Sequence, residues 1–312
     1  MASVLDSILS TTFLFSVIRV ATPLLLASMG AVITSNAGIT NIGIEGVMLV
    51  SALVGVFASA FGFGPWFGLF MAILTGVACS LAIGYVSMSL KADSVLTCIA
   101  FNTMAVGGTV YFMYAVVKDK GTTIALDSGK LPNVELPLIK DIPIVGDIIS
   151  NHNVISYLAL VMIIAVYILL YKTPLGLRIR SAGKAPNALS SVGVSLIKTR
   201  YIALGISGIL GGMAGAFMSM GYVTWFSKNM TAGRGFIALA ADAFISAFAV
   251  ALSEGDDILK AISFASYAAG ISITRQGVQP AMVDRKGLAI YQEEIESMAE
   301  KMPEIERGGK NA

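Results

Sequence analysis

Residues 154–171 read VISYLALVMIIAVYILLY and contain no charged side chain. About 20 apolar residues in one helix are enough to cross the roughly 30 Å hydrocarbon core of a bilayer. Such a helix satisfies its own backbone hydrogen bonds, which lipid cannot do. Similar apolar runs cover residues 10–35, 41–62, 64–90, 94–117 and 198–222. We therefore predict an all-α fold, a polytopic bundle of transmembrane helices.

The composition separates the chain into two parts. Of the 312 residues, 56% are apolar and 13% are charged, whereas a soluble domain has about 25% charged residues. A soluble enzyme is therefore excluded for most of the chain. Residues 1–240 hold 14 Lys and Arg against 8 Asp and Glu, and residues 241–312 hold 7 against 11. We predict a transmembrane region over 1–240 and a distinct segment with an acidic, soluble tail over 241–312.

Basic side chains predict the orientation, because Lys and Arg accumulate in cytoplasmic loops. The loop over residues 172–200 has six of them and no acidic residue, so we expect it in the cytoplasm. The connection over residues 118–153 has four lysines and five acidic residues and is expected outside. Counting spans back from these loops places Lys91 inside and the amino terminus outside.

Four glycines in the last span, Gly208, Gly211, Gly212 and Gly215, are spaced three and four residues apart. Glycine in a helix interior costs about 1 kcal/mol relative to alanine but lets two backbones approach closely. We predict a helix-packing seam, either within the bundle or between two subunits. Cys79 and Cys98 lie in apolar runs without metal-ligand spacing and are interpreted as packing residues.

Two isolated polar residues need separate predictions. Arg19 stands in an apolar context, where a charge is costly unless it reaches the interface or faces protein and water. We expect its side chain to snorkel to the interface. His152 lies between Asn151 and Asn153 and is interpreted as a surface loop residue.

The chain lacks the motifs of most enzymes. It has no phosphate-binding Gly-Lys-Ser or Gly-Lys-Thr loop, no metal-ligand cluster and no nucleophile with a base, so we predict no catalytic residue, no metal and no cofactor. Glu45 is the one carboxylate inside the first five spans. Proton-coupled carriers need intramembrane ionisable relays, so a pathway powered by another subunit is favoured. Coupling to sodium through backbone oxygens is the alternative.

Three stretches carry a family resemblance: NAGITNIGIEGVML at 36–49, LGLR at 175–178 followed by AGKAPNA at 182–188, and NMTAGRGFIALA at 229–240. Over residues 10–240 the chain resembles the permease subunits of bacterial ABC importers for nucleosides and simple sugars, a branch akin to the ribose and branched-chain amino acid permeases. The resemblance implies a multi-pass protein of the inner (plasma) membrane. It also implies a second permease subunit, ABC ATPase subunits and an extracellular substrate-binding protein as partners, and no nucleic acid.

The resemblance further implies roles for particular residues. The basic cytoplasmic loop is expected to couple the spans to the ATPase, through Gly176, Arg178, Arg180, Gly183 and Pro186. Its arginines could also serve topology alone. Residues expected to line or brace the pathway are Asn36, Asn41, Gly43 and Glu45, because an interrupted helix is tolerated in a membrane where it lines a cavity.

Residues 242–291 are similar to the C-terminal end of a ribokinase-like carbohydrate kinase, with Asp242 at the position of the catalytic base. Leu239, Ala240 and Ala241 replace the glycines expected before it, and most of a kinase is absent. We therefore predict a kinase-like remnant without activity, joined by gene fusion or by an assembly error. A nonfunctional permease–kinase hybrid is the main alternative to a working permease, and a membrane-tethered carbohydrate kinase is the second.

Overall fold

In a computed structural model, the described residues are 11–126, 128–135 and 150–253, with single residues at 262, 265, 266 and 269. The chain divides into two compact units, Met1–Leu239 and Ala240–Ala312. Most of the predicted C-terminal segment, including the acidic tail, lies outside the described residues. The first unit contains every site residue predicted above except Asp242.

Helices account for nearly all of the regular structure, which confirms the all-α prediction. The long helices are α2 (Thr11–Asn36), α3 (Ile44–Ala58), α4 (Gly64–Gly84), α5 (Ser94–Val117), α7 (Val154–Lys172), α10 (Leu196–Ala216) and α11 (Arg234–Ser253). The shorter ones are α8 (Pro174–Lys184) and α9 (Pro186–Ser191), and the π-helical turns are η1 (Ser59–Phe63), η2 (Tyr85–Ser89) and η3 (Phe217–Tyr222).

Within the described residues, five continuous helical stretches are long and apolar enough to cross a membrane. One of them, Ile44–Ser89, has 46 residues and covers most of two predicted spans, 41–62 and 64–90. Its helical path is broken in η1, where Gly62 takes φ +92° and Phe61 takes ψ 17°. Gly64 follows with φ +78°. Because glycine adopts positive φ without strain, the chain folds back there and α4 packs against α3.

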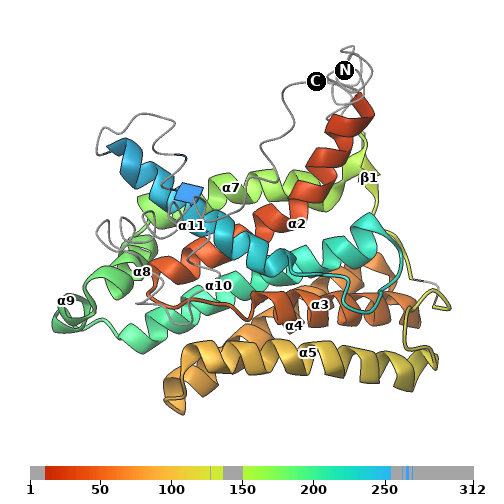
Figure 1. The fold of residues 1–312 in the computed structure, drawn as a ribbon, viewed down its shortest axis with the longest axis horizontal. Coiled ribbons are helices and arrows are strands. Elements are labelled where there is room, and N and C mark those ends of the chain that lie inside the picture. Colours follow the sequence, from red (N-terminus) through yellow and green to blue (C-terminus); the bar gives the residue numbers. More distant parts are fainter. Residues whose placement is uncertain are drawn as a thin grey trace, which may run out of the picture. The chain divides into compact units, whose positions relative to one another are not determined.

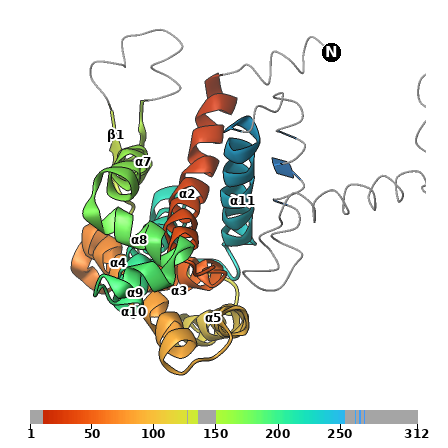
Figure 2. The same ribbon diagram turned by 90° about the vertical axis from the view of Figure 1, so that its left-hand side faces the viewer.

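Helix α10 is the central element of the first unit, with α2, α3 and α4 packed around it (Figure 1). In the stretch Leu196–Tyr222, which joins α10 and η3, 78% of an apolar 18-residue segment is buried. In α5 the corresponding share is 22%. Figures 1 and 2 both show α8 and α9 beside the beginning of α10. Helix α5 lies at the edge, against α3 and α4.

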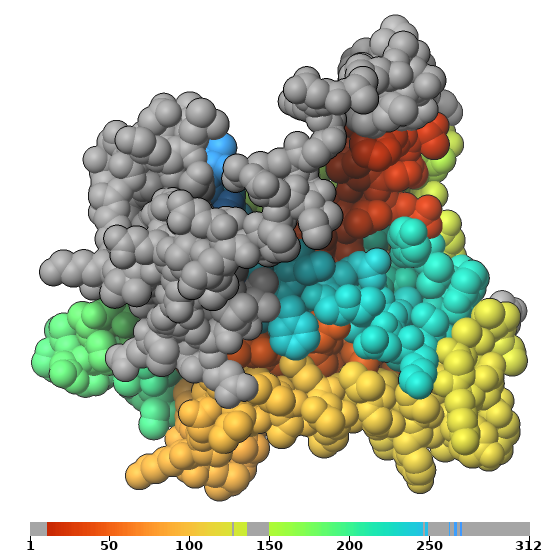
Figure 3. Space-filling view, in the orientation of Figure 1, coloured from red at the N-terminus to blue at the C-terminus, as the bar shows by residue number. Residues whose placement is uncertain are grey.

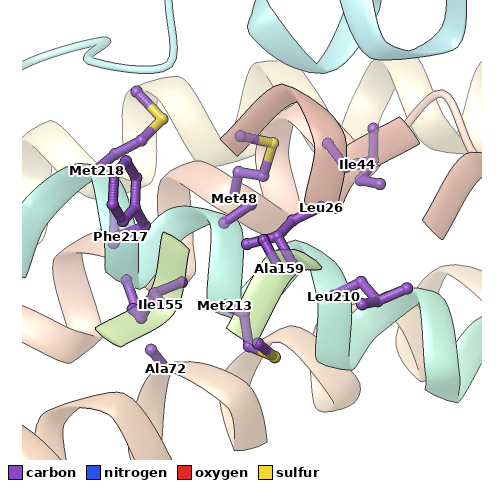
Figure 4. Close-up of a cluster of buried hydrophobic side chains, with 14 of the residues drawn as sticks. Leu26, Ile44, Met48, Ala72, Ile155, Ala159, Leu210, Met213, Phe217 and Met218 are labelled. Carbon is purple, nitrogen blue, oxygen red and sulfur yellow. The ribbon is translucent and has the colours of Figure 1, made fainter. Parts of the chain in front are cut away.

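The buried apolar side chains of this unit form one main cluster. Figure 4 shows Phe217 and Met218 from η3 with Met48 from α3, Ile155 from α7 and Leu26 from α2. These side chains come from helices that are far apart in sequence. Burial of apolar surface contributes about 25 cal/mol per Å², and here it fixes the positions of the helices that carry the polar residues described below.

The loops at the far end of α10 are joined by backbone hydrogen bonds. Strand β1 (Asn133–Val134) pairs antiparallel with β2 (His152–Asn153), and Thr122 forms a bridge with Ser227. Figure 3 shows the yellow atoms of the α5–β1 connection beside the cyan atoms of the segment that follows η3. Asp119 accepts from Gly121 N at 2.9 Å, and this bond lowers the pKa of its carboxyl.

The prediction that His152 is a surface residue is wrong. Its side chain is 3% exposed, and its ring stacks on Phe15 of α2 with the centroids 4.0 Å apart. The β1–β2 pairing draws this polar stretch against the first helix, which local sequence composition does not reveal.

In the second unit, α11 continues from Ala240 to Ser253. Asp242 lies on this part of the helix and is buried.

Candidate functional site

The connection between α2 and α3, residues 37–43, is not helical, although the sequence predicted a span from residue 41. Gly38 takes φ +75°, which allows the chain to turn after α2. Asn41 is buried, and its Nδ2 donates to Ser207 Oγ at 3.3 Å, in the middle of α10. Arg200 Nε donates to Ala37 O at 3.3 Å. The connection is therefore held along α10.

Glu45 lies in the first turn of α3, is buried, and accepts two backbone hydrogen bonds from a distant part of the chain. Gly233 N donates to Oε1 at 2.8 Å, and Gly235 N donates to Oε2 at 2.6 Å. Helix α11 begins at Arg234, so the carboxylate lies at its amino end, where the helix dipole and free N–H groups favour negative charge.

The approach of these two segments depends on glycine. A Cβ atom at position 235 would lie 2.7 Å from Glu45 Cα, closer than real Cβ contacts allow. Gly233 takes φ +82°, and Ala232 before it takes φ +45°. The stretch around residues 229–235 is thus shaped to place its backbone on Glu45, and two stretches quoted for the family resemblance meet at this point.

Asn102 of α5 completes this arrangement and was missed by the sequence analysis. Its Oδ1 accepts from Gly46 N at 2.9 Å, and its Nδ2 donates to Ile42 O at 3.1 Å. The amide thus bridges the two ends of the turn that leads into α3. An asparagine in the apolar run 94–117 was the available signal. Gly43 packs beside this bridge, against Ile83 and Cys98.

The predicted coupling loop folds into α8 and α9. Thr173 caps α8, with Gly176 N donating to its Oγ1 at 3.1 Å. A Cβ at Gly176 would overlap Leu169 O, and a Cβ at Gly183 would overlap Asn36 O. Gly176 therefore allows α8 to pack closely on α7, and Gly183 allows α8 to pack closely on the connection after α2. Pro186 is the first residue of α9, where its missing N–H has no cost.

The two predicted coupling arginines occupy different environments. Arg178 is exposed and lines a cleft of about 410 Å³ between α8 and the start of α10, together with Lys198, Ser195 and Gly193. Arg180 is half-buried, with its Cζ 5.0 Å from the centroid of the Tyr171 ring. Its Nε is buried and has no hydrogen-bond partner within the described chain.

The predicted glycine face of α10 contacts two helices. A Cβ at Gly208 would lie 2.6 Å from Gly76 O, and one at Gly212 would lie 2.7 Å from Ala72 O, both in α4. Gly211 faces Val47 of α3, and a Cβ at Gly215 would overlap Met48 O of the same helix. Within the described residues this seam therefore lies inside one chain.

Arg19 was expected to snorkel, but its guanidinium binds protein. Nη2 donates to Tyr222 O at 2.5 Å, and Cζ lies 4.0 Å from the centroid of the Tyr222 ring. The C-terminal end of η3 packs beside α2 and supplies both partners, a contact that hydropathy cannot reveal. Arg19 also lines two cavities, of about 180 Å³ and about 70 Å³.

Comparison with known proteins relates the chain to transport proteins. The family model described as "Branched-chain amino acid transport system / permease component" matches residues 13–248. The guanosine ABC transporter permease protein NupQ of Bacillus subtilis is 35% identical over 236 residues, which cover 72% of each chain. The putative glucose ABC transporter permease protein TsgC13 of Haloferax volcanii is 33% identical, over 72% of this chain and 67% of the relative.

A third relative, the nucleoside ABC transporter permease protein NupC of Lactococcus lactis, is 32% identical over 231 residues and 72% of each chain. No solved structure matches the chain. The family match includes Asp242 and continues eight residues beyond the limit of 240 predicted above. The comparisons give no support to the kinase-like resemblance of residues 242–291.

The family match and the five apolar helices identify a multi-pass protein of the plasma membrane. Three of its polar side chains, those of Glu45, Asn41 and Asn102, form hydrogen bonds within the bundle. The chain belongs to the family of permease components of branched-chain amino acid transport systems.

Proposed function

We propose that this chain is a permease subunit of an ABC importer and forms part of the translocation pathway for a nucleoside or a simple sugar. Two of the relatives described above are named as nucleoside or guanosine permeases and one as a putative glucose permease. The proposed partners are a second permease subunit, ABC ATPase subunits and an extracellular substrate-binding protein. The chain itself catalyses no reaction, and the ATPase supplies the energy.

The observation that carries this proposal is the direct contact between α8 and the connection after α2. Gly183 lies against the backbone of Asn36 and Gly38. The same connection leads through Asn41 to Glu45, which holds the start of α11. A displacement of α8 by an ATPase would therefore act on the interrupted segments inside the bundle. This arrangement supports the proposal that Gly176, Gly183 and Pro186 give the coupling element its shape.

The cleft beside α8 suits an acidic partner surface. Arg178 and Lys198 line it, and the amino end of α10 at Ser195 adds a positive dipole end. Complementary charges steer association and suppress wrong partners. We assign ATPase docking to Arg178, and we assign the packing of α8 on α7 to Arg180, because its guanidinium lies over the Tyr171 ring of α7.

Charge reversal tests the docking assignment. Arg178→Glu and Lys198→Glu should each reduce recovery of the cognate ABC ATPase with the affinity-tagged permease, by roughly tenfold if one close charge pair is replaced by repulsion. Lys172→Glu is the matched control, because Lys172 is an exposed basic residue at the end of α7 outside the cleft. Equal recovery of ATPase with all three variants would contradict the docking role.

A further inference from the structure

We propose that the cavity between α2, η3 and the start of α11 binds the base of a purine nucleoside that carries a ring carbonyl group. The cavity has a volume of about 180 Å³, and its lining includes Arg19, Phe217, Tyr222, Trp225, Ser227 and Arg234. This inference rests on the proposed transport function and names the substrate and its contact residues within the pathway.

The charge of the cavity points to a ligand rich in hydrogen-bond acceptors. Two arginines line it, and none of its described lining residues is acidic. Backbone carbonyls hold both side chains: Arg19 Nη2 donates to Tyr222 O at 2.5 Å, and Arg234 Nη1 donates to Met230 O at 2.9 Å. A cation in a membrane-spanning bundle is costly and therefore marks a functional site. Each guanidinium has further N–H donors to offer.

The aromatic residues favour a planar ligand over a sugar alone. Trp225 is half-buried in the cavity wall, and Cζ of Arg19 lies over the Tyr222 ring, 4.0 Å from its centroid. Nucleic-acid bases stack on aromatic rings and on guanidinium planes. Arg also pairs in bidentate fashion with the O6 and N7 acceptors of guanine. A purine with a ring carbonyl uses both features, whereas a free sugar has no π face.

The size of the cavity agrees with one ring system. Pockets that enclose whole drug-sized ligands have volumes of about 300 to 1,000 Å³, larger than the 180 Å³ here. A second cavity of about 70 Å³ shares Arg19 and Phe217, and its other lining residues include Asn133, Asn153 and Ser156. The Asn153 amide is engaged by Leu131 O and Ile155 N, so the Asn133 amide and the Ser156 hydroxyl are the groups that can hydrogen-bond a ribose. We therefore place the base in the larger cavity and the sugar toward the smaller one.

The tryptophan content of the chain allows a direct binding test. There are two tryptophans, and Trp66 lies at the start of α4, 56% exposed and outside the cavity lining. The full chain is prepared in lipid nanodiscs as Trp66→Phe, which leaves Trp225 as the sole tryptophan, and as Trp225→Phe, which leaves Trp66. Guanosine should quench the tryptophan fluorescence of the first protein saturably. The second protein should lose signal only through the inner-filter effect of guanosine absorption. Ribose should quench neither.

Adding Arg19→Gln to the Trp66→Phe protein should raise the half-saturating guanosine concentration by roughly tenfold, because a bidentate arginine–guanine pair is lost. Equal guanosine quenching of the two single-tryptophan proteins would overturn the proposal. Saturable quenching by ribose, or an unchanged half-saturating concentration in the Arg19→Gln protein, would also overturn it.

Uptake by the complete transporter separates this inference from the proposed function. Trp225→Leu should lower guanosine uptake by about tenfold or more, because base stacking on an aromatic ring is lost, while Trp66→Leu stays near wild type and Trp225→Phe recovers part of the loss. Immunoblots of membranes verify equal amounts of each protein. If the wild type imports guanosine and Trp225→Leu does so equally well, the cavity assignment fails alone. If the wild type imports neither nucleosides nor sugars, the proposed function fails.

Discussion

Glu45 shows how one residue can connect two distant segments of a membrane protein. Its carboxylate receives N–H groups from Gly233 and Gly235, about 190 residues away. Lipid offers no replacement partner for those N–H groups, and each unsatisfied backbone group in the hydrocarbon region costs several kcal/mol. Glu45 therefore acts as a cap for α11. This role does not require the carboxylate to exchange a proton during transport.

We expect Glu45→Ala to lower the free energy of unfolding by about 2 kcal/mol or more, because the buried N–H of Gly235 and the partly buried N–H of Gly233 both lose their acceptor. Asp93→Ala is the matched control: Asp93 caps α5 through Val95 N and Leu96 N, both at 2.9 Å, but is exposed. At this exposed site water can take the place of the side chain, so we expect Asp93→Ala to lower the free energy of unfolding by only about 1 kcal/mol. Unfolding is followed with a thiol-reactive dye that reports exposure of Cys79 and Cys98. Equal losses for both variants would contradict the buried cap.

Gly235 packs directly on Glu45, and its substitution should also destabilise the protein. Gly235→Ala would place a methyl group 2.7 Å from Glu45 Cα, a backbone atom that cannot move aside. We expect a loss of about 1 to 3 kcal/mol from overpacking and a lower yield of folded protein in membranes. Gly107→Ala in α5 has nothing within 4 Å and should be neutral or slightly stabilising. A Gly235→Ala protein as stable as Gly107→Ala would refute the close contact.

At the level of elements, hydropathy predicted the spans well, because lipid imposes a minimum length of apolar helix. It placed residues 36–40 between two spans, and residues 37–40 are indeed not helical, but it began the next span at residue 41, three residues before α3, since Ile42 is as apolar as a continuing span would be. The contact of Arg19 with Tyr222 of η3 and the burial of His152 against Phe15 join segments that are far apart in sequence, so hydropathy could not predict them. The candidate site was recognised through its three family-like stretches, but the pairing of Glu45 with residues 233–235 needed the structure.

The glycine seam of α10 provides a prediction with its control on the same helix. Gly208→Ala would bring a Cβ to 2.6 Å from Gly76 O, so α4 and α10 must separate. Gly205 has nothing within 4 Å, and Gly205→Ala should gain up to about 1 kcal/mol in helix propensity. We expect Gly208→Ala to lose about 1 to 3 kcal/mol from overpacking, measured as a fall in unfolding temperature in detergent. A fall of the same size with Gly205→Ala would indicate that the seam is not the cause.

For the whole molecule, the contacts of unit Met1–Leu239 form one connected series. Helix α8 touches the connection after α2, that connection is held along α10 by Asn41, and Glu45 holds the beginning of α11. The arginine and tryptophan cavity lies where α2, η3 and the segment before α11 meet. An ATPase acting at α8 could thus change the geometry of the proposed pathway, although the chain has no nucleotide-binding loop in its sequence.

ATP-driven solute uptake tests the central claim most directly. Liposomes containing the cognate ATPase and partner permease, with ATP inside and the substrate-binding protein outside, are assayed for radiolabelled guanosine and ribose with and without this chain. We predict that accumulation of at least one of these solutes requires both ATP and this chain, with guanosine preferred. Accumulation that is equally fast when the chain is omitted would contradict the account.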